Sequence, residues 1–213
     1  MYITHLPTGK RFQKIPETLT IMSIDPGTVN LAIRIEKRTP GRIETFFSEV
    51  LNIKHSEFYE TLTYLLNMLN DLNKIIMKCH IIVIEQQISK LNPPATRIFE
   101  RLLTYFTLKL SSSLLNPIIF EIDTKAVKQF FNIPKGKNKG VKDYVGICSE
   151  EILERGGELK ELEKLRLLPK SLRNHIDDAI TQIEVICHKE DLYTILKPRH
   201  LEKLSKKWKK LEK

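Results

Sequence analysis

Residues 20–35 constrain the fold more than any other stretch of the sequence. An apolar run from Thr20 to Ile24 ends at Asp25, turns at Pro26-Gly27, and is followed by a second apolar run from Val29 to Ile35. The first run is apolar at successive positions, without helical spacing, which predicts a strand buried on both faces of a sheet. Pro-Gly is a strong turn signal, so the two runs predict a β-hairpin. Asp25 either caps this turn or meets a charged or polar partner, because a buried carboxylate without one is costly.

The rest of the chain predicts an α/β protein. Apolar patterning indicates further strands at 42–53, 81–85 and 117–122, and helices at 55–78, 93–112, 125–131, 158–168 and 171–188, with one more that follows a loop at 134–140 and ends near 155. Three antiparallel strands followed by strands reached through helical crossovers give a mixed five-stranded sheet flanked by helices. We therefore expect one domain over 19–190, an irregular N-terminal arm over 1–18, and a basic C-terminal tail over 197–213 that forms a helix.

Composition excludes several classes of protein. No run approaches the roughly 20 apolar residues that a membrane helix needs, and the N-terminus has no long apolar segment followed by a cleavage site. The three cysteines, Cys79, Cys148 and Cys187, are scattered and odd in number. This usage suits a reducing compartment and lacks the paired spacing of a zinc site. We expect an intracellular protein that is neither secreted nor bound to a membrane.

Basic residues form two clusters in a chain whose net charge is +9. The tail over 197–213 has eight Lys and Arg residues and only two Glu. Four of the basic residues are Lys206, Lys207, Lys209 and Lys210. The second cluster surrounds two glycines and consists of Lys135, Lys137, Lys139 and Lys142. Such clusters favour a polyanionic partner, most often nucleic acid, although a surface tuned for solubility has the same composition. Trp208 is the one aromatic side chain of the tail apart from His200, and it could instead dock the helix on the core or on a second subunit.

Two carboxylates occupy equivalent places in the predicted sheet. Asp25 ends one buried strand, and Glu85 ends the run Ile81-Ile82-Val83-Ile84. If these strands lie side by side, both carboxylates reach the same edge of the sheet. Carboxylates crowded at one place repel each other unless a cation lies between them. Oxygen-rich sites suit Mg²⁺ or Mn²⁺, and a two-metal site cleaves phosphodiesters in line.

The helix at 171–188 supplies further candidates. At about 100° per residue, its apolar stripe consists of Ile176, Ala179, Ile180, Ile183, Ile186 and Cys187. His175, Asp178 and Gln182 lie along one border of this stripe, whereas the side predicted to face solvent carries Asp177, Thr181, Glu184 and His188. Of the adjacent aspartates, Asp178 is therefore the expected site residue and Asp177 a surface charge. His175 taken alone also fits a histidine at the edge of the core.

Four motifs, in order, resemble those of RuvC-type Holliday-junction resolvases, which belong to the RNase H-like superfamily. Ile24-Asp25-Pro26-Gly27-Thr28-x-Asn30 resembles their first motif. Ile84-Glu85-x-Gln87 resembles the second, in the form seen in poxvirus and fungal mitochondrial resolvases. Ala126-Val127-Lys128-Gln129, followed by Lys139-Gly140-Val141, is similar to the lysine-bearing segment. His175-x-x-Asp178-Ala179-Ile180 is similar to the last motif. At the position of His175, many members of the family have aspartate and some have histidine.

The resemblance implies an RNase H-like fold and a specific activity. We expect a metal-dependent endodeoxyribonuclease that resolves four-way junctions by symmetric nicking, with two Mg²⁺ or Mn²⁺ ions. Asp25, Glu85, Asp178 and His175 would be the catalytic residues and metal ligands, and Lys128 or Lys139 would stabilise charge on the scissile phosphate, with Lys125 as a third possibility.

A homodimer is the expected assembly. Two symmetric cuts need two active sites, and a twofold axis is the simplest way to supply them. Three alternatives remain at this point. The first is a YqgF-like RNA-processing nuclease with the same acidic site. The second is an ATPase of the actin type, which would need a duplicated domain and a second phosphate turn. The third is a DNA-binding module without activity.

Overall fold

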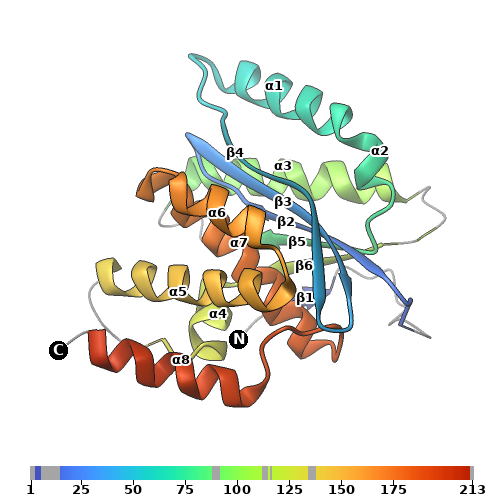
Figure 1. The fold of residues 1–213 in the computed structure, drawn as a ribbon. Coiled ribbons are helices and arrows are strands. Elements are labelled where there is room, and N and C mark those ends of the chain that lie inside the picture. Colours follow the sequence, from blue (N-terminus) through green and yellow to red (C-terminus); the bar gives the residue numbers. More distant parts are fainter. Residues whose placement is uncertain are drawn as a thin grey trace.

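The computed structural model describes residues 3–5, 15–87, 92–111, 115, 117–133 and 138–211. At its centre is a sheet with the order β1-β6-β5-β2-β3-β4, drawn in Figure 1. The strands are β1 (Ile3–His5), β2 (Leu19–Asp25), β3 (Asn30–Thr39), β4 (Arg42–Asn52), β5 (Ile81–Glu85) and β6 (Ile118–Ile122). The helices are α1 (Phe58–Asp71), α2 (Asn73–Ile76), α3 (Pro93–Leu110), α4 (Thr124–Phe130), α5 (Asn138–Gly156), α6 (Leu159–Leu167), α7 (Lys170–Lys189) and α8 (Pro198–Leu211).

The mixed five-stranded sheet predicted from the sequence is confirmed. β2, β3 and β4 pair antiparallel, whereas β2, β5 and β6 pair parallel. β1 adds a short sixth strand that pairs antiparallel with β6, and it lies within the segment that the sequence indicated to be an irregular arm. Three residues of backbone pairing at a sheet edge carry too little apolar periodicity to be recognised in a sequence.

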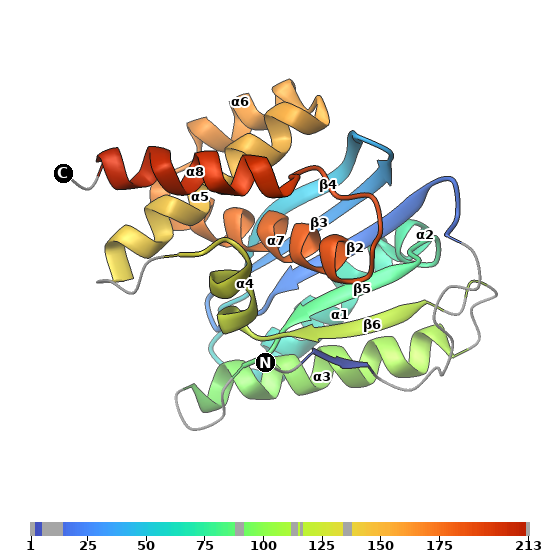
Figure 2. The ribbon, with the colours of Figure 1, turned by 90° about the horizontal axis from the view of Figure 1, so that it is seen from below.

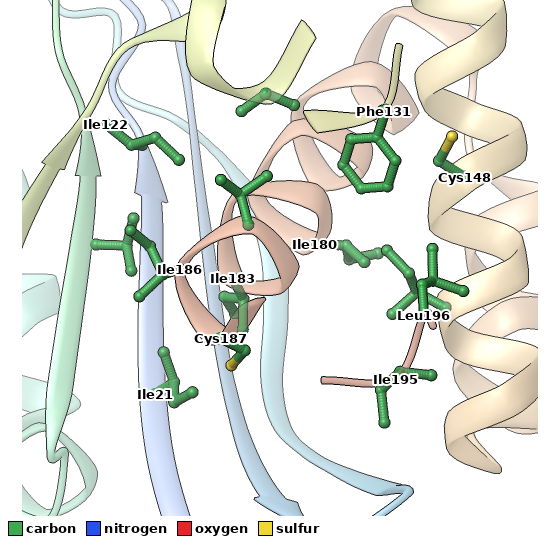
Figure 3. Close-up of a cluster of buried hydrophobic side chains, with 14 of the residues drawn as sticks. Ile21, Ile122, Phe131, Cys148, Ile180, Ile183, Ile186, Cys187, Ile195 and Leu196 are labelled. Carbon is green, nitrogen blue, oxygen red and sulfur yellow. The ribbon is translucent and has the colours of Figure 1, made fainter. Parts of the chain in front are cut away.

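Helices cover both faces of the sheet, which makes three layers (Figures 1 and 2). One apolar cluster joins α1 and α3 to one face of the strands. The other lies between the opposite face and α7, and it extends outward to α4, α5, α6 and α8. Figure 3 shows part of this second cluster, where Ile186 of α7 lies beside Ile21 and Ile122 of the strands and Ile180 is turned toward Leu196 and Phe131. Because α5 and α6 pack outside α7, α7 is buried on most of its circumference.

Buried charged side chains join β3 to α7. Arg34, Glu36 and Arg38 lie at alternate positions on the face of β3 that α7 covers, and with Glu184 of α7 they form what we term the β3–α7 ion-pair network. Arg34 and Arg38 pair with Glu36 at 2.5 and 2.6 Å, and Arg38 pairs with Glu184 at 2.5 Å. All four residues are fully buried. Burial alone would raise the pKa of Glu36, but the charges of Arg34 and Arg38 outweigh it and hold that pKa below its usual value.

The chain beyond α7 is attached to the core through this network. The backbone N–H groups of Ile195 and Leu196 donate to Glu184 Oε1 at 2.8 and 2.6 Å. α8 then packs on α5, where the Trp208 and Tyr144 rings meet edge to face with centroids 5.4 Å apart. Trp208 is therefore docked on the core. The division of the chain into an arm, a nuclease domain and a tail stays a prediction.

All three cysteines are buried and free. Among the described residues, no helix is both long enough and apolar enough to cross a bilayer.

Candidate active site

The parallel pairing of β2 and β5 brings Asp25 and Glu85 to one edge of the sheet. Ile24 is the register partner of Ile84, so the next positions, Asp25 and Glu85, end neighbouring strands side by side. Side chains alternate along a strand, which places both carboxylates on the face that α7 covers. Asp25 is 7% exposed. The structure thus brings together the two acidic residues whose equivalence the sequence indicated.

α7 supplies the two other candidates, which lie one turn apart. His175 Nδ1 lies 2.6 Å from Asp25 Oδ2. This hydrogen bond raises the pKa of His175 above its ordinary value, against the opposing effect of burial. Asp178 has a pKa raised to about 7, first by burial and then by the negative charge of Asp25. The positive charges of Lys142 and His175 partly offset that rise.

Glu85 is affected by the negative charges of both other carboxylates, Asp25 and Asp178. Burial raises its pKa well above the ordinary value, and the charges of Asp25 and Asp178 raise it further. A hydrogen bond that Thr124 Oγ1 donates to Glu85 Oε1 at 2.5 Å acts in the opposite direction. Glu85 and Asp178, whose pKa values are raised by burial and by the nearby charge of Asp25, form with Asp25 a site that suits a bound cation.

A buried polar chain orients Glu85, and the sequence prediction did not include it in the site. Ser23 Oγ donates to Gln182 Oε1 at 2.7 Å, which leaves the Gln182 amide N–H free to donate to Glu85 Oε2 at 3.2 Å. Ser23 is fully buried and Gln182 is 2% exposed. Ser23, a polar residue in the middle of a mostly apolar strand, was the available sequence signal for this hydrogen-bonded chain. No sequence signal pointed to Thr124, which begins α4 after β6.

The prediction that Asp177 is a surface charge is wrong. Asp177 is 1% exposed; its carboxylate accepts a hydrogen bond from Ser149 of α5 and pairs with Arg173 at 3.3 Å. Burial raises its pKa to about 6. It points to α5, away from Asp25 and Glu85. The physical reason is that α5 covers the side of α7 that a simple amphipathic helix would leave to solvent.

The same error affected two other residues of α7. Thr181 and Glu184 are fully buried rather than exposed, and Glu184 belongs to the β3–α7 ion-pair network. His188, on the same side near the end of the helix, is exposed as expected.

No protein-family model and no curated protein matches the sequence. The fold does match solved structures. A Thermus thermophilus RuvC structure has a TM-score of 0.55 at 15% identity, and the match covers 81% of this chain and 97% of that one. T. thermophilus RuvC in complex with a Holliday junction substrate has a TM-score of 0.53 at 14% identity, covering 80% and 95%. The chain has the RNase H-like fold of RuvC. A Fowlpox virus resolvase in complex with Holliday junction DNA has a TM-score of 0.48 at 16% identity, covering 81% and 97%.

Within this RuvC fold, a cleft opens beside the carboxylates. Its volume is about 170 Å³, and its lining includes Glu85 and Asp178 together with Thr124, Val127, Lys128, Val141, Lys142, Val145 and Gln182. Lys128 of α4 and Lys142 of α5 are exposed at this cleft. The structure therefore places two of the predicted lysines next to the acidic residues.

The other predicted lysines fall into two groups. Lys206 and Lys207 are exposed on α8, as is Lys125 on α4. The structure does not describe Lys135 and Lys137, nor the side chains of Lys139, Lys209 and Lys210.

The acidic residues of the RuvC fold match a divalent cation in donor type. Carboxylate oxygens are the ligands that Mg²⁺ and Mn²⁺ prefer, and a cation would offset the mutual repulsion of the three carboxylates. Across the described part of the chain, however, no group of three or more His, Cys, Asp or Glu side chains has the spacing of a ready-made metal site. Asp25 Oδ2 is bonded to His175, and both Glu85 oxygens accept hydrogen bonds. The residues fit such a cation by charge and chemistry, because each Glu85 oxygen keeps a second lone pair for an ion while Thr124 and Gln182 hold the carboxylate in place.

Proposed function

We propose that this protein is a metal-dependent DNA endonuclease that resolves four-way junctions. The observation that carries the proposal is the convergence of Asp25, Glu85 and Asp178, with His175, at one edge of a RuvC-fold sheet. The RuvC chain of the same fold is in complex with a Holliday junction substrate. The net charge of +9 suits a polyanionic partner.

The reaction is hydrolysis of a phosphodiester. A water oxygen forms a new bond to phosphorus while the bond from phosphorus to one sugar oxygen breaks, and that oxygen takes up a proton. Asp25, Glu85, Asp178 and His175 would hold two Mg²⁺ or Mn²⁺ ions, which would supply charge stabilisation and activation of the water. The hydrogen bonds from Thr124 and Gln182 keep Glu85 oriented toward the site.

The exposed lysines hold the DNA. Lys128 and Lys142 flank the cleft beside Glu85 and Asp178, at the place that the phosphate next to the cut would occupy. Lys206 and Lys207 on α8 contact the backbone of a duplex arm. Each phosphate that is neutralised adds about 0.9 to the slope of log affinity against log salt.

A homodimer makes the symmetric pair of cuts. Each chain supplies one acidic site, and a twofold axis matches the symmetry of a junction. Because the protein acts on DNA and its three cysteines are free, a reducing compartment that contains DNA is the expected location. Analytical ultracentrifugation with and without junction tests the assembly, and a chain that stays monomeric on the junction contradicts it.

The decisive experiment offers one protein preparation four substrates in Mg²⁺: a mobile four-way junction, a linear duplex, an RNA–DNA hybrid and ATP. We expect paired nicks in the junction alone. Asp25→Asn should abolish cleavage yet bind the junction, because it removes a metal ligand and no phosphate contact. Asp71→Asn, an exposed carboxylate on α1, is the matched control and should cut normally. Preferential hydrolysis of RNA or of ATP would refute the proposal.

A further inference from the structure

The cleft beside the carboxylates has an apolar wall that neither metal ions nor phosphates require. Val127 of α4 and Val141 and Val145 of α5 line it together with Glu85 and Asp178. We refer to these three residues as the valine wall. Val127 and Val145 are each 6% exposed, and Val141 is half-buried at the opening. Ions and phosphates need hydrogen-bond donors or charges, so the valine wall indicates an additional, apolar part of the ligand.

The size and the charges of the cleft narrow the chemistry of that part. A volume of about 170 Å³ is well below the roughly 300–1,000 Å³ of pockets that enclose whole small molecules, so the cleft has room for one small group such as a nucleobase. Lys128 and Lys142 line the same cleft, and both are exposed. A ligand that joins an apolar group to an anion fits this cleft, and a nucleotide has both parts. Its base would contact the valines and its phosphate the lysines.

A base within a duplex cannot reach this cleft while it remains paired and stacked. Extruding one costs a few kcal/mol, and the cost is least where pairing is already broken, as at a branch point. We propose that the valine wall receives an extruded nucleobase of a nucleotide that adjoins the scissile phosphate. The inference rests on the proposed junction nuclease function and adds a source of selectivity: an intact duplex incurs an unpairing cost that a junction largely avoids.

The test uses junctions that carry 2-aminopurine, one position at a time, at the nucleotides flanking the branch point. Fluorescence is read with the full chain in EDTA, so the result is independent of cleavage. We expect a severalfold rise at one flanking position when wild-type protein saturates the junction. Val141→Phe fills the opening of the cleft and should abolish the rise while junction affinity is retained. Ile147→Phe, a half-buried residue of the same helix outside the cleft, is the control and should keep it.

A second experiment removes the nucleobase from the junction instead of filling the cleft of the protein. With Mg²⁺, Val141→Phe should slow cutting of the normal junction by about tenfold or more, the usual value of a filled apolar specificity pocket. On a junction with an abasic site at the responding position, wild type and Val141→Phe should cut at the same rate, because the two changes remove the same contact. No fluorescence rise at any flanking position of a saturated junction, or an undiminished Val141→Phe defect on the abasic junction, overturns the inference and leaves the nuclease function intact. A wild-type chain that binds no junction overturns both.

Discussion

Asp178→Asn should make the metal-free protein more stable at neutral pH. The pKa of Asp178 is raised from 3.8 to about 7, so the folded protein favours the protonated carboxyl. Well below pH 3.8 both the folded and unfolded states keep the proton, and the group costs no stability. As the pH rises toward 7, the unfolded state releases its proton first, and the folded state loses stability relative to it. The full penalty applies above pH 7.

The size of the penalty follows from the two pKa values. Their difference corresponds to about 4 kcal/mol, which we reduce to about 2 kcal/mol because water reaches part of the Asp178 side chain. Asparagine has a similar shape and no charge to bury, so it avoids this cost. In a chain of this size, about 2 kcal/mol raises Tm by roughly 4–8 °C.

The assay is thermal or urea unfolding in EDTA between pH 4.5 and 8.5. We expect the stability gain of Asp178→Asn over wild type to be small near pH 4.5 and to reach its full size by pH 8, with Mg²⁺ stabilising only the wild type. Asp71→Asn should follow the wild type throughout. A variant that is less stable than wild type at pH 8, or a gain that does not change with pH, would refute the electrostatic reasoning.

Four further outcomes are expected. Gln182→Met should raise the Mg²⁺ concentration for half-maximal cleavage by about tenfold or more, the usual effect of a lost support to a metal ligand, with junction binding unchanged; an unaltered Mg²⁺ titration would contradict this. His175→Ala should slow cleavage by about 100-fold or more, and His175→Asp should restore much of it, whereas full activity of the alanine variant would leave His175 a purely structural residue. Arg38→Met, which leaves Glu36 and Glu184 without their shared partner, should lower the free energy of unfolding by about 3–5 kcal/mol in urea titrations; a loss below about 1 kcal/mol would argue against the network. Trp208→Ala should lower stability by about 3–5 kcal/mol by circular dichroism, and an unchanged Tm would show that α8 docks by other contacts.

The strand-end carboxylates could be placed from the sequence because a strand carries its own geometry. An apolar run closed by an acid predicts both the strand and the position of the acid at its mouth, and two such runs connected by a helical crossover pair in parallel. Asp25 and Glu85 needed only this local information. The chain from Ser23 through Gln182 to Glu85 could not be derived in the same way, because its members are 159 and 97 residues apart.

α7 was harder to interpret because its surroundings are not local. The periodicity argument assumed one apolar face and one face in water, which holds only when a helix lies at the surface. α7 lies between the sheet and α5, so Asp177 and Glu184 are buried and find partners on other elements. The polar face of β3, with Arg34, Glu36 and Arg38, was the signal: three charges at alternate positions of a central strand need opposite charges on the helix above them.

The contacts of Glu184 also determine how the protein opens and closes in solution. Its carboxylate accepts hydrogen bonds from the amide N–H groups of Ile195 and Leu196 inside the core, although these residues belong to the connection that leads to α8. Such a connection would normally fray, and its amide protons would be among the fastest in the protein to exchange with deuterium. Here the two amides should exchange as slowly as those of β2 and β3, since releasing them exposes a buried carboxylate. We therefore expect α8 to unfold together with the core, and hydrogen–deuterium exchange at Ile195 and Leu196 would then report on the integrity of α7 beneath the active-site residues.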